Sequence, residues 1–264
     1  MRSQPSDHWQ VGSAYERYVG RWSRHVAPAF LAWLDEPPGR RWVDVGCGTG
    51  ALCSAIVERC APAALTGVEP SGGFIAAARQ ALADRVDLRQ GSAAAIPLPD
   101  DSVDVVVSGL VLNFLPDLPA ALRESARVCT PGGTFGAYVW DYAGRMELMR
   151  HFWDAAVALD AAAVQWDEGR RFPICRPDAL LGACAAAGFG AAETTAIEIA
   201  TPFASFEDFW EPFLGGQGPA PAYAMSLDEQ ARNELRRTLR ERLPAEDDGS
   251  IRMVARAWAV RATV

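Results

Sequence analysis

The chain has 264 residues, half of them hydrophobic, with a formal net charge of -8 and a pI near 5.0. This length suits one α/β domain with insertions or two small domains, and the acidic balance argues against nucleic acid as the main partner. The first ten residues lack the apolar core of a signal peptide, and no apolar run is long enough to cross a bilayer. We therefore expect a cytoplasmic protein without membrane insertion.

The six cysteines form no C-x-x-C pair, and no group of cysteines and histidines has the spacing of zinc ligands. We therefore expect reduced thiols and no metal site.

Residues 9–36 are rich in aromatic side chains, and apolar residues recur at helical spacing between Val26 and Leu34. This pattern predicts a helix that ends before Pro37.

The sequence VDVGCGTG, at residues 43–50, predicts a buried strand, a glycine turn, and a helix that begins at Ala51. Gly46, Gly48 and Gly50 lack a Cβ, so the backbone can take unusual dihedrals there and a ligand can lie against it. The helix that follows directs its unpaired N–H groups and the positive end of its dipole toward the turn.

A second apolar run, over residues 64–68, ends in Glu69. A carboxylate at the end of the second strand of such a unit is placed to accept both hydroxyls of a ribose. The glycine turn and Glu69 together predict a cofactor that contains adenosine. The turn alone leaves the cofactor open, because Gly46, Gly48 and Ala51 also satisfy the dinucleotide pattern G-x-G-x-x-G/A of nicotinamide and flavin enzymes.

Three more strands are predicted downstream, over residues 86–90, 103–108 and 134–140. The second of these is a near-continuous β-branched run, which is typical of a strand buried in a parallel sheet. It ends at Ser108, at the edge where open α/β sheets bind ligands. A turn at Pro131-Gly132-Gly133 precedes the last of them.

Four segments, taken in order, resemble the methyltransferase type 11 group of the class I S-adenosylmethionine-dependent methyltransferases, which includes enzymes of quinone biosynthesis. They are VDVGCGTG, GVEPS, IPLPDDSVDVVVSGLVLNFLPD and ALRESARVCTPGGTFGAYVWD, and they cover about residues 40–142. The resemblance implies S-adenosylmethionine as cofactor. It also implies a Rossmann-like α/β fold with a seven-stranded, mostly parallel sheet, whose last strand is antiparallel and lies between strands five and six.

The resemblance assigns parts of the cofactor to residues. The glycine turn and the backbone of Cys47 would cradle the aminoacyl and ribose parts, Glu69 would hold the ribose, Ser92 and Ala93 the adenine, and Ser108 the methionine end. The family usually has an acidic residue where this chain has Ser92, and a hydroxyl bonds the adenine edge more weakly. The predicted cofactor-binding residues in this part of the chain are Gly46, Cys47, Gly48, Gly50, Glu69, Pro70, Ser71, Ser92, Ala93 and Ser108.

The N-terminal segment offers two more candidates. Tyr15 could stack on the cofactor or shield its sulfonium cation, and Arg21 could hold its carboxylate. Packing of the segment on the sheet is an equally good interpretation of these residues.

Beyond Trp140 the resemblance thins. The pattern predicts a helix over residues 176–188, a strand over 191–201, a helix from about Ser226, as N-cap, to Leu243, and a last strand over 251–260. Aromatic windows at 140–153 and 203–213 suggest an apolar or ring-containing acceptor, although core packing explains them nearly as well. The predicted substrate-binding residues are Asn113, Trp140, Tyr142, Trp153 and Trp210.

Methyl transfer from a sulfonium needs mainly alignment of the acceptor in a dry pocket. A base is needed only if the acceptor atom must lose a proton. The sequence shows no unambiguous base, and the candidate catalytic residues are His151, Asn113 and Asp141.

We predict a single methyltransferase domain over residues 1–264, with an N-terminal helical cover (1–38), a cofactor-binding core (39–142) and lid insertions (143–175 and 203–225). The predicted activity is methyl transfer from S-adenosylmethionine to a small-molecule acceptor. The alternatives are an NAD(P)-dependent oxidoreductase and a catalytically silent S-adenosylmethionine-binding protein.

Overall fold

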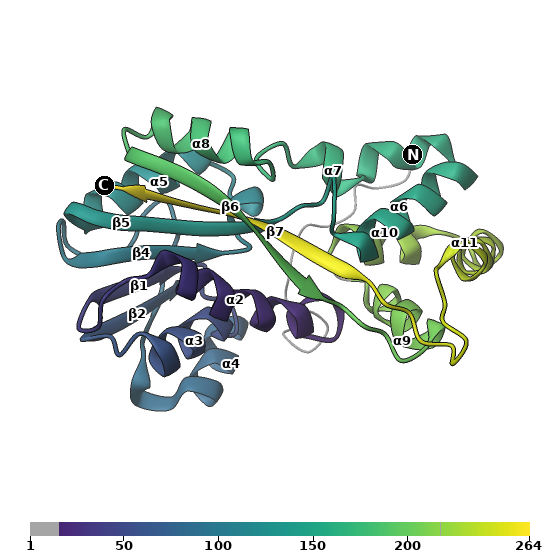
Figure 1. Ribbon diagram of the computed structural model, residues 1–264, viewed down its shortest axis with the longest axis horizontal. Coiled ribbons are helices and arrows are strands. Elements are labelled where there is room, and N and C mark those ends of the chain that lie inside the picture. Colours follow the sequence, from purple (N-terminus) through teal and green to yellow (C-terminus); the bar gives the residue numbers. More distant parts are fainter. Residues whose placement is uncertain (1–15, 217) are drawn as a thin grey trace. The chain divides into compact units, whose positions relative to one another are not determined.

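The computed structural model describes residues 16–216 and 218–264 (Figure 1). In this part of the chain one seven-stranded sheet has the order β3-β2-β1-β4-β5-β7-β6. The strands are β1 (Arg41–Val45), β2 (Ala64–Glu69), β3 (Asp87–Gln90), β4 (Val103–Gly109), β5 (Cys129–Trp140), β6 (Gly190–Ala200) and β7 (Val254–Thr263).

The five strands from β3 to β5 are parallel, and β1 lies between β2 and β4. The chain order reverses between β1 and β4, and open α/β sheets bind ligands outside the carboxyl ends of the strands at such a point. Backbone hydrogen bonds join Gly133 to Val264 and Asp141 to Arg256, so β7 runs antiparallel to β5. The predicted sheet is confirmed, including the place of its last strand.

The chain divides into two compact units, and each is described by itself. The first unit holds the described residues up to Trp22, together with Trp140–Pro173 and Glu198–Arg256. The second unit holds Ser23–Val139, Ile174–Ile197 and Ala257–Val264. Both predicted lid insertions fall almost wholly in the first unit and the predicted cofactor-binding core in the second, while the single domain over the whole chain stays a prediction.

Polar caps begin two of the helices of the second unit. The hydroxyl of Ser71 accepts the N–H of Phe74 at the start of α4, and the carboxylate of Asp117 accepts the N–H of Ala120 at the start of α5. The helices of this unit are most of α2 (Arg21–Leu34), then α3 (Ala51–Arg59), α4 (Gly72–Leu82), η2 (Ala83–Arg85), η3 (Leu112–Phe114), α5 (Leu118–Val128) and α8 (Pro177–Ala186). Figure 1 shows α5 and α8 as neighbours.

The first unit has a core of aromatic rings. Phe152 stacks on Phe213 with ring centroids 4.5 Å apart, and Tyr18 meets the same Phe213 ring edge-on at 5.4 Å. The helices of this unit are η1 (Glu16–Gly20), α6 (Glu147–Leu159), η4 (Ala161–Trp166), α7 (Glu168–Arg171), α9 (Phe206–Trp210), η5 (Glu211–Gly215), α10 (Pro219–Ser226) and α11 (Glu229–Arg242).

Two local predictions are wrong. Ser226 is not the N-cap of α11 but the last residue of α10, and the cap is Asp228, whose carboxylate accepts the N–H of Ala231 at 2.8 Å. The segment Pro131–Gly133 is not a turn before a strand but lies inside β5, which begins at Cys129. Gly133 is in the strand because it pairs with the end of β7, a long-range partner that the local sequence does not reveal.

Candidate functional site

The glycine turn between β1 and α3 has a left-handed backbone, with φ of +78°, +53° and +91° at Gly46, Gly48 and Gly50. A Cβ at Gly46 would lie 2.7 Å from the Val111 side chain, and one at Gly50 would lie 2.6 Å from Leu82. A Cβ at Gly48 would meet no atom within 4 Å. Packing within the protein therefore requires the outer two glycines, and Gly48 is the one whose open side suits a ligand.

The N–H groups of this turn hold the turn itself together. Gly46 and Cys47 both donate to the carbonyl of Val68, at 2.8 and 3.1 Å. Gly48 donates to the carboxylate of Glu69 at 3.1 Å. Because these three groups already have acceptors, a ligand would meet the Cα surface and carbonyl groups of the turn rather than free N–H donors.

Glu69 ends β2 and is buried against the glycine turn. One carboxylate oxygen accepts the N–H of Gly48, and the other accepts the N–H of Ser71 at 2.9 Å. Burial raises the pKa of Glu69, and the two backbone hydrogen bonds oppose that shift. Each oxygen keeps a further lone pair, so the carboxylate can still accept hydroxyl groups from a ligand. Pro70 lies between Glu69 and Ser71 and is exposed. Its carbonyl accepts a hydrogen bond from the side-chain amide of Gln90.

Asp44 is a second buried carboxylate at this end of the sheet, to which the sequence alone assigns no role. One of its oxygens accepts the thiol proton of Cys53 at 3.2 Å, and the other has no hydrogen-bond partner among the described residues. Burial raises the pKa of Asp44 to about 7, opposed by the hydrogen bond from Cys53. A buried oxygen without a partner needs a donor. The signal for Asp44 in the sequence is its place two residues before Gly46, the first glycine of the turn.

A tight turn follows β3. The N–H of Ala95 donates to the carbonyl of Ser92 at 3.0 Å, and the N–H of Ala94 donates to the Ser92 hydroxyl at 3.2 Å. The N–H of Gly91 donates to the carbonyl of Glu69, which places the start of this turn beside the predicted ribose site. Ser92 is exposed and Ala93 half-buried, so the proton of the Ser92 hydroxyl stays available to a ligand.

Ser108 and Asn113 lie at the carboxyl end of β4 and just beyond it. The buried Ser108 hydroxyl donates to the carbonyl of Val45 at 2.8 Å and so ties β4 to β1. The amide nitrogen of Asn113 is buried and has no acceptor among the described residues. Asn113 is therefore the better placed of the two to donate to a ligand.

Arg21, in the first unit, is one of the two candidates from the N-terminal segment. Its guanidinium lies 4.4 and 4.7 Å from the ring centroids of Trp22 and Phe203 and forms an ion pair with Asp208 at 2.7 Å. The other two guanidinium nitrogens have no partner within the described part of the chain. Arg21 thus keeps donors for a carboxylate. Tyr15, the other candidate, lies outside the described residues.

Asp141 and His151, also in the first unit, have different surroundings. The buried carboxylate of Asp141 accepts two hydrogen bonds from Arg256, at 2.8 and 2.6 Å, in an ion pair that favours a structural role. His151 lies on α6 and is half-buried. Burial lowers its pKa, and two nearby carboxylates oppose the shift. The imidazole is therefore mostly neutral near pH 7, the form that accepts a proton.

The aromatic residues predicted to bind the acceptor are all buried, and they are Trp140, Tyr142, Trp153 and Trp210. Trp153 meets the ring of Phe152 edge-on at 5.1 Å and that of Tyr223 at 5.3 Å. Such packing explains the burial of Trp153 without a ligand. Contact of these residues with an acceptor stays a prediction.

Glu168 is a buried carboxylate of the first unit that the sequence does not point to. One of its oxygens accepts the indole N–H of Trp153, and the other has no partner in the described part of the chain. Burial raises the pKa of Glu168 to about 7. Its neighbour Asp167 pairs with Arg150. Nothing in the local sequence EGRR distinguishes this buried acid from an exposed one.

Two negative findings apply to the described residues. They contain no group of three or more histidine, cysteine, aspartate or glutamate side chains that is arranged to hold a metal ion. They also contain no helix with the length and apolar character that crossing a membrane requires.

The site residues divide between the two units. The glycine turn, Glu69, Ser92, Ser108 and Asn113 belong to the second unit, and these residues gather at the carboxyl ends of β1, β2, β3 and β4. The candidates Arg21, Asp141, His151 and the four aromatic residues belong to the first unit. The roles of these residues toward a ligand stay predictions.

Comparison with known proteins gives matches over the same region. Residues 43–137 match a family described as Methyltransferase domain. A malonyl-[acyl-carrier protein] O-methyltransferase from Serratia marcescens is 36% identical over 129 residues, which cover 47% of this chain and 49% of the relative. An uncharacterized methyltransferase from Mycobacterium tuberculosis is 39% identical over 128 residues, which cover 48% of this chain and 49% of the relative. The chain spans about half the length of the curated relatives it matches.

Solved structures show the same fold. Phosphoethanolamine N-methyltransferase 2 from Haemonchus contortus, in complex with phosphomonomethylethanolamine and S-adenosylhomocysteine, aligns with a TM-score of 0.58 at 17% identity. The alignment covers 96% of this chain and 56% of that one. The resemblance seen in the sequence is confirmed: residues 43–137 match the methyltransferase family, and the solved structures with this fold include methyltransferases bound to S-adenosylhomocysteine and to S-adenosyl-L-methionine.

Proposed function

We propose that this protein transfers a methyl group from S-adenosylmethionine to a small-molecule acceptor with an apolar or aromatic body. The observation that carries the proposal is the hydrogen bond from Gly48 to Glu69, because it joins the glycine turn to the acidic residue at the end of β2. These are the two features from which an adenosine site is expected, and they come from separate parts of the sequence.

The residues of the second unit fit this cofactor. The open side of Gly48 leaves room for a ligand against the backbone. The unpartnered oxygen of Asp44 offers an acceptor for a donor such as the amino group of the methionine part, and Glu69 offers acceptors for the ribose hydroxyls. Ser92 keeps a hydroxyl proton for the adenine ring.

The chain's own residues would then contribute mainly position. S-adenosylmethionine supplies a methyl group on a positively charged sulfur, whose bond electrons leave with a neutral thioether. Glu69 and the glycine turn would fix the nucleoside so that the methyl carbon has one direction of approach. Such orientation is worth roughly 7–11 kcal/mol of activation free energy. Asn113 would orient the acceptor through its unpartnered amide, and the neutral His151 would accept a proton where the acceptor loses one.

The acceptor class rests on two supports. The first unit is rich in aromatic side chains, and two relatives have names that indicate small or apolar acceptors: the malonyl-[acyl-carrier protein] O-methyltransferase and a sterol 24-C-methyltransferase from Gibberella zeae. The fold alone does not establish methyl transfer, since a [4+2]-cyclase also aligns with this chain, with a TM-score of 0.53. A protein that binds the cofactor without transferring its methyl group therefore remains the second candidate function.

Ligand-induced stabilisation tests the cofactor. S-adenosylhomocysteine at 100 times its dissociation constant should add about 2.7 kcal/mol to the free energy of unfolding, and NADH should add nothing. We expect Glu69→Ala to weaken S-adenosylhomocysteine binding by roughly 1.5–3 kcal/mol, because a hydrogen-bonded charged acceptor is lost. Glu69→Gln should also weaken binding, because its amide NH2 cannot accept one of the two backbone N–H groups that hold the carboxylate in place. Stabilisation by NADH alone, or unchanged affinity in both variants, would rule the assignment out.

A transfer assay tests the reaction. The whole protein, incubated with methyl-labelled S-adenosylmethionine and a panel of phenols, aromatic amines and quinols, should label at least one of them. Tight cofactor binding with no labelled product across the panel would favour the silent binding protein.

A further inference from the structure

We propose that Arg127 is a positioning residue for the cofactor: it holds the segment of residues 94–100 in place and thereby fixes the turn at Ser92 and Ala93 against the adenine ring. The inference rests on the proposed function, because it assigns the adenine to that turn. All residues involved belong to the second unit.

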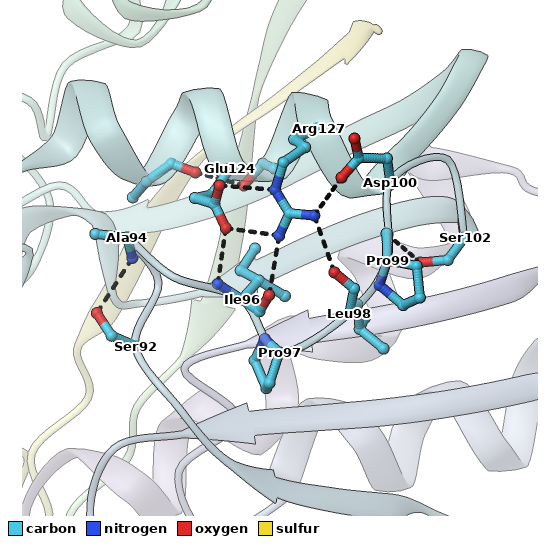
Figure 2. A network of polar contacts seen from close by, with 12 residues as sticks. Ser92, Ala94, Ile96, Pro97, Leu98, Pro99, Asp100, Ser102, Glu124 and Arg127 are labelled. Atoms are coloured by element: carbon cyan, nitrogen blue, oxygen red, sulfur yellow. Dashed lines mark hydrogen bonds and ion pairs between the residues drawn. The ribbon is translucent and has the colours of Figure 1, made fainter.

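The guanidinium of Arg127 lies between helix α5 and the loop that follows β3, as Figure 2 shows. On the helix side it donates to both oxygens of Glu124, at 2.8 Å each. On the loop side it donates to the carbonyls of Ile96 (3.0 Å) and Leu98 (2.9 Å) and to the carboxylate of Asp100 (2.7 Å). Three of these five hydrogen bonds reach a loop that has no regular secondary structure there, and the other two hold the planar guanidinium against the helix.

Glu124, on helix α5, also binds the loop. We call the Glu124–Arg127 pair, with its contacts to the loop, the clamp. One of the two Glu124 oxygens, Oε2, accepts both from Arg127 and from the N–H of Ile96, the latter at 2.9 Å. Both backbone groups of Ile96 are therefore bound to the Glu124–Arg127 pair. The pair also lowers the pKa of Glu124, so its carboxylate is ionised at neutral pH.

Ile96 follows directly on the predicted adenine turn. Ala95 closes that turn by donating to the carbonyl of Ser92, so the anchored residue is the next one in the chain. Pro97 lies against Gly91 at the other end of the turn, where a Cβ on Gly91 would be 2.8 Å from the proline ring. The turn from Gly91 to Pro97 is thus closed on itself and anchored at Ile96.

A purely stabilising ion pair does not account for this arrangement. The side chains of Arg127, Asp100 and Glu124 are 32%, 73% and 21% exposed, and pairs that reach solvent to this extent contribute little to stability. The contacts to backbone carbonyls are the ones that specify where the loop lies. We therefore expect the loss of these contacts to change ligand affinity more than the free energy of unfolding.

The test compares two ligands in three variants of the whole protein. Isothermal titration gives the affinities for S-adenosylhomocysteine and for S-inosylhomocysteine, which carries an oxygen in place of the adenine amino group. In Arg127→Met we expect S-adenosylhomocysteine to bind roughly tenfold more weakly, the effect of about one hydrogen bond. We also expect most of the wild-type preference for the amino group to be lost.

Arg127→Lys keeps the charge but not the planar fork, so it should behave like Arg127→Met. The matched control is Arg123→Met, because Arg123 is an exposed arginine on the same helix, and it should bind both ligands as the wild type does.

Hydrogen exchange of the unliganded protein gives a second measurement. Arg127→Met should speed amide exchange in peptides covering residues 92–100, and Arg123→Met should not. The positioning role is overturned if Arg127→Met keeps both the wild-type affinity and the wild-type preference, even where its melting temperature falls. Failure of the wild type to bind S-adenosylhomocysteine would instead overturn the proposed function, and this inference with it.

Discussion

Glu168 shows how one side chain should couple the stability of this protein to pH. Burial raises its pKa from 4.5 to about 7, so between these values the folded state holds a proton that the unfolded state has lost. The stability that this proton contributes is complete below about pH 4.5 and is lost as the pH rises through 7. A shift of this size corresponds to about 3 kcal/mol.

We therefore expect Glu168→Gln to be more stable than the wild type at pH 8 and to lose this advantage toward pH 4.5. Glutamine has nearly the same shape, keeps an acceptor for Trp153 and carries no charge to desolvate. Urea unfolding at several pH values measures the difference in free energy of unfolding between the two proteins. Taking the difference removes the contribution of Asp44, whose raised pKa acts in the same direction in both. Parallel stability curves would show that Glu168 is not protonated in the folded protein.

At the scale of single elements, the N-cap of α11 is Asp228 and not the predicted Ser226. The carboxylate of Asp228 accepts the N–H of Ala231, whereas the hydroxyl of Ser226 donates to the carbonyl of Tyr223 in the preceding helix. Loss of an N-cap costs about 1 kcal/mol. We expect Asp228→Ala to lower the free energy of unfolding by about that amount and Ser226→Ala to lower it clearly less, as measured by urea unfolding. The absence of a measurable loss in Asp228→Ala would contradict the cap at Asp228.

The elements that local sequence defines could be predicted. The strand, glycine turn and helix at residues 43–59 follow from an apolar run, three glycines and helical spacing, and the structure has them at the predicted positions. The cap of α11 was predicted at Ser226 and lies at Asp228, because either side chain can accept a helix N–H and the two stand only two residues apart. The strand at Pro131–Gly133 could not be foreseen, since its partner lies more than a hundred residues away.

Site residues that belong to a sequence motif could be predicted. Residues whose role depends on their surroundings in the folded protein could not. Glu69 was predictable from its place after a strand, and the structure puts it against Gly48. The clamp at Arg127 joins groups up to 31 residues apart, and no local pattern shows that its guanidinium meets three parts of a loop. Glu168 is distinguished only by its burial and by the hydrogen bond from Trp153, and the local sequence shows neither.

At the scale of the whole molecule, the chain passes five times between the two compact units, so neither unit is one continuous segment. Experiments on function therefore need the complete chain. The division also separates the predicted roles. Apart from Tyr15 and Arg21, the residues predicted to bind the cofactor lie in the second unit. Apart from Asn113, those predicted to bind the acceptor lie in the first.

Hydrogen exchange with and without S-adenosylhomocysteine should follow this division. An amide exchanges when the structure around it opens locally. A bound ligand makes any opening that disrupts its site less frequent, so the amides whose exchange slows show where the ligand binds. We expect slower exchange in peptides covering residues 43–50, 66–71 and 88–96, and no change over 147–159, where the cofactor has no predicted contact. The peptide at residues 16–22 tests the role of Arg21. Slower exchange there supports its contact with the cofactor carboxylate. Unchanged exchange leaves Arg21 with its ion pair to Asp208 alone. NADH serves as the control ligand and should slow none of these peptides. Slowing confined to the first unit would contradict the proposed cofactor site, because the glycine turn and Glu69 belong to the second.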